Sequence, residues 1–147
     1  PRKPLLPLET AKAKLANYPD PDALYNLGRM EYLYFKSTVE EYEAGCPAYE
    51  TEMTFDQTII SLGDIAFVPF PFEIFSEVTM RLDEYSPIRY TLSLSNTNGY
   101  NAYLPSQDQL VRGGYEIACF RYNCSHPLVD NADQILIDEN LRILQDN

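Results

Sequence analysis

The stretch ISLGDIAFVPFPFEIFSEVTMRLDEY, residues 60–85, decides the fold because its hydrophobic spacing changes within it. Apolar and polar residues alternate up to Gly63-Asp64, and the apolar run IAFV follows at 65–68. A two-residue turn of this kind predicts a β-hairpin, and the continuous apolar run predicts that its second strand is buried on both faces. Two prolines then end the strand.

The second half of this stretch returns to helical spacing. Phe75, Val78 and Leu82 recur at intervals of three and four, which predicts an amphipathic helix. Glu73 therefore falls at the junction between strand and helix. A carboxylate in such apolar surroundings requires a cation or a hydrogen-bond donor, which makes Glu73 a candidate functional residue. The alternative is a carboxylate that backbone amides hold at a helix N-terminus.

Helical spacing also dominates residues 1–49. LETAKAKLANY, residues 8–18, predicts a short amphipathic helix. Asp20 is expected to cap a second helix that has Pro21 at its first position and ends near Gly45. One face of this helix is expected to be buried through Ala23, Leu27, Met30 and Tyr34. The opening of the chain is therefore predicted to be a helical hairpin.

A strand and a polar loop follow the central stretch. IRYTLSLS, residues 88–95, alternates and predicts a strand that turns Ile88, Tyr90, Leu92 and Leu94 to the core. The loop at 96–116 is rich in asparagine, glycine and tyrosine, and loops at strand ends commonly carry ligand sites. Its asparagines and Gly99 also suit a turn with positive φ, without any function.

The remainder of the chain is expected to be mixed. Ser106 can cap a short helix that ends at Gly113-Gly114, residues 115–118 add a strand, and a helix closes the chain. Ile137, Leu141 and Leu144 give this last helix its apolar face. The predicted fold class is thus mixed α/β (α+β), with a helix-covered mixed sheet over 50–147. Residues 1–147, the hairpin at 1–49 included, are expected to form a single domain or the C-terminal fragment of a larger one.

Composition limits the function. The 147 residues are 45% hydrophobic, enough for one core, and 22 acidic against 11 basic residues give a net charge of −11. This charge argues against nucleic acids and anionic membranes as partners, and no run approaches the roughly 20 apolar residues of a membrane span. No signal peptide is recognisable at the start. Cys46, Cys119 and Cys124 follow no zinc or disulfide pattern, so we expect buried free thiols. Unpaired cysteines favour a reducing, cytoplasmic compartment, but the localisation stays open.

Two kinds of side chain could carry chemistry besides the carboxylate. His126 is the single histidine, so chemistry that needs two imidazoles cannot come from this chain alone; we expect it to cap the final helix rather than to bind metal. Tyr100, Tyr103 and Tyr115 bracket the polar loop. A phenol can donate to a developing oxyanion or bind a metal as phenolate, although most of the twelve tyrosines must be structural.

Three motifs, in order and with compatible spacing, resemble the neutral/alkaline (non-lysosomal) ceramidase family. They are GDIAFVPFPFEIFSE at 63–77, SNTNGYNAYLPSQDQL at 95–110 and GGYE at 113–116. The resemblance runs from about Thr10 to the end and corresponds to the C-terminal part of the family's catalytic domain. The hairpin with LANYPD is similar to the shorter bacterial relatives.

This resemblance implies a zinc-dependent amide hydrolase. In the family, two histidines, a glutamate and a tyrosine hold zinc, and zinc-activated water attacks the amide carbonyl of an N-acyl sphingoid base. By motif, Glu73 and Tyr103 would be metal ligands and Tyr115 would hydrogen-bond at the reacting centre. Both zinc histidines belong to the family's preceding portion, so this chain would hold half a site and be inactive alone. Phe72 stands where the family usually has glycine and is expected to crowd the turn beside Glu73.

The expected partners follow from the same resemblance. They are the preceding part of the domain, an N-acyl lipid substrate and, through apolar surface left uncovered, further copies of the chain. The alternative function is a non-catalytic binding or structural module that keeps the fold with a decayed metal site. An acidic calcium-binding module is disfavoured because no DxDxDG spacing occurs.

Overall fold

The computed structural model of this chain describes residues 1–18 and 20–146. They form two compact units: Pro1–Met53 with Gly113–Val129, and Thr54–Arg112 with the C-terminal segment from Asp130. The expected fold class, mixed α/β with helices packed on a sheet, is confirmed.

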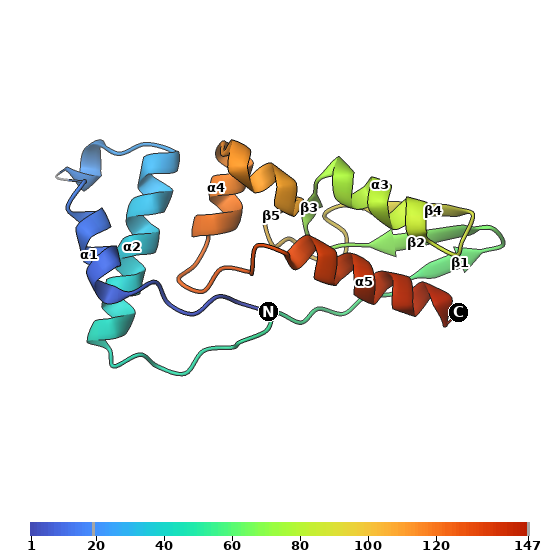
Figure 1. Ribbon diagram of the computed structural model, residues 1–147, viewed down its shortest axis with the longest axis horizontal. Helices are drawn as coiled ribbons and strands as arrows, with labels where there is room; N and C mark the ends of the chain where they lie inside the picture. Colours follow the sequence, from blue (N-terminus) through green and yellow to red (C-terminus); the bar gives the residue numbers. More distant parts are fainter. Residues whose placement is uncertain (19, 147) are drawn as a thin grey trace. The chain divides into compact units, whose positions relative to one another are not determined.

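The first unit is helical. Helices α1 (Leu8–Leu15) and α2 (Leu27–Glu43) form the predicted hairpin, and α4 (Tyr115–Tyr122) packs on α2 (Figure 1). The N-terminal segment is tied to the strand-like chain after α4 by an antiparallel bridge between Arg2 and Leu128. The prediction of a strand at 115–118 is wrong, because the apolar run IACF at 117–120 fits a buried helix as well as a strand. Cys119 in this helix is buried as expected, whereas Cys46 is exposed, contrary to the prediction of buried thiols.

The second helix is shorter than expected. The Asp20 carboxylate does accept hydrogen bonds from the backbone N–H groups of Asp22 and Ala23, at 3.2 and 3.4 Å, as a cap. It caps only one 3₁₀ turn, Pro21–Ala23, because Asn26 adopts a φ of +48° and interrupts the helical path. Ala23 is consequently exposed, and the residues buried on α2 are Phe35 and Thr38.

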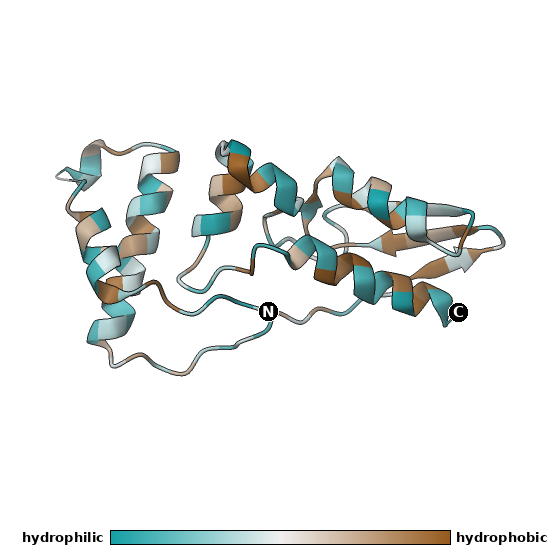
Figure 2. Cartoon of the chain, viewed as in Figure 1, coloured by the Kyte–Doolittle hydropathy of each residue, from teal (hydrophilic) through white to brown (hydrophobic). Residues whose placement is uncertain are grey.

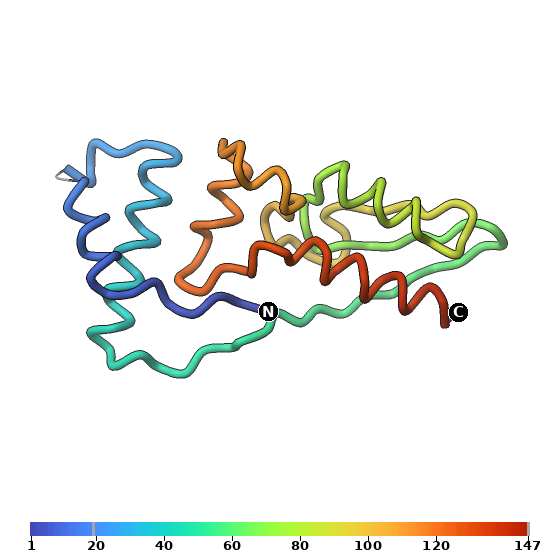
Figure 3. Tube along the Cα trace, viewed as in Figure 1, coloured from blue at the N-terminus to red at the C-terminus, as the bar shows by residue number. Residues whose placement is uncertain are grey.

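The second unit is a three-stranded sheet with helices on one face. Its order is β1 (Ile60–Leu62), β2 (Ile65–Pro69) and β4 (Tyr90–Leu94), with β1 antiparallel and β4 parallel to β2. The chain passes from β2 through α3 (Ser76–Tyr85) back to β4 (Figure 3). The hairpin with its two-residue turn is as predicted, but the prediction that its second strand is buried on both faces is wrong. Ala66 and Val68 are buried, whereas Ile65 and Phe67 on the other face are only half-buried, because the helices cover one face of this sheet.

Helices α3 and α5 (Ala132–Gln145) cover the sheet and complete the core. Strand β2 and much of α5 are coloured as hydrophobic in Figure 2. The fully buried members of this core are Ala66, Val68, Phe70, Val78, Leu82, Ile137 and Leu144. The expected apolar faces of both helices are therefore confirmed.

The face assignment for β4 was wrong. Thr91 is 3% exposed and lies under the helices, whereas Tyr90, Leu92 and Leu94 are 49%, 45% and 37% exposed. The Thr91 N–H donates to the Asp83 carboxylate at 3.0 Å, and its hydroxyl contacts that of Ser86 at 2.6 Å, so its polar groups are satisfied when buried. Alternation shows which residues share a face, but not which face the helices cover.

A second, two-stranded parallel sheet pairs β3 (Glu73–Ile74) with β5 (Tyr103–Leu104). The 3₁₀ helix Gln107–Arg112 follows β5, where a short helix after Ser106 was predicted. None of the helices in the described part of the chain is both long and apolar enough to cross a membrane.

Candidate functional site

Glu73 and Tyr103 are register partners in the small β3–β5 sheet. The Glu73 N–H donates to the Ala102 carbonyl at 3.0 Å, and the Phe75 N–H donates to the Leu104 carbonyl at 3.1 Å, which fixes this register. Directly opposed residues of neighbouring strands project to the same face of a sheet. A half-buried carboxylate and a half-buried phenol, distant in sequence, are therefore neighbours.

The polar loop before β5 holds the turn before β3. Backbone N–H groups of Asn96 and Asn101 donate to the carbonyls of Phe72 and Pro71, at 2.9 and 2.7 Å. Asn96 has a φ of +52°, as expected for this loop. Gly99 lies so close to the turn that an added Cβ would meet the Pro71 side chain at 3.2 Å. The asparagine-rich loop thus positions Glu73 through its backbone.

Phe72 belongs to the core. Its side chain is 3% exposed and packs edge-on against Phe55, with ring centroids 6.0 Å apart and an interplanar angle of 85°. The ring therefore anchors the turn that precedes Glu73. A glycine at this position would remove that anchor.

Tyr115 lies in the other unit. It is the first residue of α4, follows Gly114 with its φ of +102°, and is 51% exposed. The three residues assigned by motif are thus divided, with Glu73 and Tyr103 in the second unit and Tyr115 in the first.

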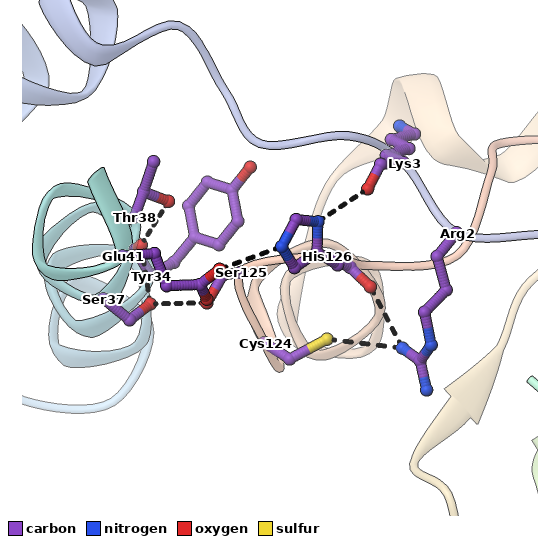
Figure 4. Close-up of polar contacts among 9 residues, drawn as sticks. All are labelled: Arg2, Lys3, Tyr34, Ser37, Thr38, Glu41, Cys124, Ser125 and His126. Carbon is purple, nitrogen blue, oxygen red and sulfur yellow. Dashed lines mark hydrogen bonds and ion pairs between the residues drawn. The ribbon is translucent and has the colours of Figure 1, made fainter. Parts of the chain in front are cut away.

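His126 is engaged in structural contacts. Its Nδ1 lies 3.1 Å from the Lys3 carbonyl and its Nε2 lies 2.9 Å from the Glu41 carboxylate (Figure 4). The ring also stacks on Tyr49, with centroids 3.5 Å apart and planes 9° apart. Both ring nitrogens therefore have oxygen partners within the protein. A metal could bind His126 only by replacing one of them.

The predicted helix cap by this histidine is wrong. The residue that precedes α5 is Asn131, and no side-chain hydrogen bond caps this helix. His126 instead ties the N-terminal segment to α2.

Zinc in a protein usually takes four ligands, and the chain can offer part of such a set. Glu73 and Tyr103 provide two oxygen donors on one face of a sheet. Within residues 1–18 and 20–146, no group of three or more His, Cys, Asp and Glu side chains could hold a metal ion. A four-ligand zinc site would therefore need two further ligands besides Glu73 and Tyr103.

The sequence interpretation missed a cavity of about 320 Å³ in the first unit. Its wall includes four aromatic rings and one carboxylate, from Tyr18, Glu31, Tyr34, Phe35 and Tyr122. Glu31 and Tyr34 are three residues apart on a helix, so the sequence could have shown that these two side chains are neighbours on one helix face. The contribution of α4 depends on tertiary packing and has no local signal.

Together the fold and these residues define a mixed α/β protein with a paired carboxylate and phenol at the start of two short parallel strands. Known protein families, curated proteins and solved structures were compared with the chain, and none of the three comparisons found a match.

Proposed function

We propose that this chain supplies two ligands, Glu73 and Tyr103, to the zinc site of a ceramidase-like amide hydrolase that acts on an N-acyl lipid or a related amide. The observation that supports the proposal is the register of β3 and β5, which pairs these two residues. The motif resemblance assigns both residues to one metal site, and the strand register, which does not depend on that resemblance, makes them neighbours.

Each residue has a chemical role in this proposal. The Glu73 carboxylate and the Tyr103 phenolate would hold the ion as oxygen ligands. Zinc, when bound, would lower the pKa of its water and polarise the amide carbonyl. The role of Tyr115 as a hydrogen-bond donor to the developing oxyanion comes from the motif resemblance alone. Two histidines from outside these residues would complete the ligand set, so the chain alone would be inactive.

Zinc content and amide hydrolysis of the full-length protein that contains this chain test the proposal. Glu73→Gln removes the anionic ligand, so we expect zinc content and hydrolysis of N-acyl substrates to fall at least roughly tenfold. Glu84→Gln is the matched control, because Glu84 is an exposed glutamate on α3 that loses the same charge. Equal zinc content and activity in the two variants would contradict the assignment.

A non-catalytic binding or structural module is the second candidate. The observation in its favour is Phe72, which serves the core directly beside Glu73 where the family usually has glycine. Metal analysis separates the two candidates. Zinc in the full-length protein supports the hydrolase, whereas a full-length protein that binds no zinc supports the module.

A further inference from the structure

The aromatic cavity of the first unit has a continuous wall of rings. The Tyr34 ring lies 5.2 Å from that of Phe35 and 5.3 Å from that of Tyr122, between centroids. Phe35 and Tyr122 are 6.2 Å apart, so the three rings contact one another. Tyr18, which follows α1, adds a fourth ring to the lining of a cavity of about 320 Å³.

A fixed carboxylate lies among these rings. The Tyr18 hydroxyl donates a hydrogen bond to the Glu31 Oε2 at 2.6 Å. Burial, then this hydrogen bond and the charge of Glu31, raise the pKa of Tyr18 to about 12. Burial and the same charge also raise the pKa of Tyr122. Both phenols are therefore neutral donors next to an anion.

The Glu31 carboxylate takes part in none of the ion pairs among the residues that the structure describes. Arg121 acts on Tyr122, where its charge partly offsets the rise in pKa. Lys14 lines the same cavity from α1 but is exposed, so water and salt weaken its charge without removing it. The cavity thus combines aromatic rings, whose faces are electronegative, with a carboxylate outside these ion pairs.

The wall is held in place by contacts along α2. Ser125 Oγ donates to Ser37 Oγ at 3.3 Å, and the His126–Glu41 pair lies one turn further along the helix. Figure 4 shows these side chains reaching from α2 to the segment 124–126. Because this segment directly follows α4, the contacts fix Tyr122 opposite Tyr34. The cavity is therefore preorganised.

We infer that this cavity binds a small organic cation of the alkylammonium class. The faces of tyrosine and phenylalanine rings attract such cations, and the Glu31 carboxylate supplies the matching charge. A neutral apolar ligand would leave the half-buried Glu31 carboxylate without a matching charge. A calcium or magnesium ion requires several oxygen ligands, and Glu31 is the one carboxylate among the residues that line this cavity. The inference does not depend on the zinc proposal, whose two metal ligands lie in the other unit.

Calorimetric titration of the 147-residue chain with choline and with 3,3-dimethylbutan-1-ol tests the charge requirement. The second compound has the shape of choline but carries carbon in place of the quaternary nitrogen. We expect choline to bind roughly tenfold more tightly than this neutral analogue. Equal affinities, or no binding of choline, would overturn the inference.

Variants test the site within the chain. Glu31→Gln should weaken choline binding roughly tenfold, whereas Glu40→Gln, an exposed glutamate of α2 outside the cavity, should not change it. Lys14→Gln should strengthen binding about twofold, because it removes a repelling charge. A misfolded variant would not bind more tightly, so this gain separates a ligand site from a structural defect. Equal affinities of the Glu31 and Glu40 variants would overturn the assignment.

Discussion

At the scale of single residues, the one histidine of the chain shows how a chemically versatile side chain can serve structure. His126 bridges the Lys3 carbonyl and the Glu41 carboxylate and stacks on Tyr49. These contacts join the N-terminal segment, α2 and the segment after α4 within the first unit. The first unit has few large buried aliphatic residues. The contacts of the His126 ring therefore supply stability that a larger apolar core would otherwise provide.

His126→Gln should lower the stability of the chain. The substitution removes the imidazole contact to the Glu41 carboxylate and the ring stack, and hydrogen bonds to charged groups contribute about 1.5–3 kcal/mol, so we expect a loss of roughly 2 kcal/mol. The measurement is the midpoint of urea denaturation at an unchanged slope. In the double variant with Glu41→Gln, the two losses should be less than additive. Strict additivity would show that the pair does not interact.

At the scale of elements, the sequence predicted local turns and helices, but it did not predict which strands and faces pack together. The turn at Gly63-Asp64 and the helical spacing after Phe75 each follow from local rules, and both elements occur. The position of Glu73 at a strand–helix junction followed from the same rules. Its pairing with Tyr103 depends on the register of two-residue strands, which no periodicity specifies. The prediction of which face of β4 lies on the core was wrong for a related reason. A strand of alternating residues can turn either face to the helices.

Two leucines test this corrected face. Leu82 on α3 is fully buried, whereas Leu92 on β4 is 45% exposed. We expect Leu82→Ala to cost about 2–5 kcal/mol of unfolding free energy and Leu92→Ser to cost less than about 1 kcal/mol. Chemical denaturation of both variants provides the measurement. Similarly large losses of unfolding free energy in both variants would support the sequence-based prediction that Leu92 faces the core.

At the scale of the whole molecule, net charge and exposed apolar surface have opposite effects on self-association. One face of the β1–β2–β4 sheet carries apolar side chains with no helix on them. Its exposed members are Ile60, Leu62, Tyr90, Leu92 and Leu94. Apolar surface of this kind favours association, whereas the net charge of −11 keeps copies of the chain apart.

The chain should therefore self-associate, and more strongly as salt increases, because screening weakens the repulsion while the apolar attraction remains. Light scattering across a concentration series at low and high salt measures this. Leu62→Lys places a charge on the apolar face and should shift the equilibrium towards monomer. Met80→Lys is the matched control, since Met80 is 67% exposed on α3, away from that face. Both variants add the same charge, so a difference between them would assign the association to the apolar sheet face. A wild-type chain that stays monomeric at every protein and salt concentration would refute self-association.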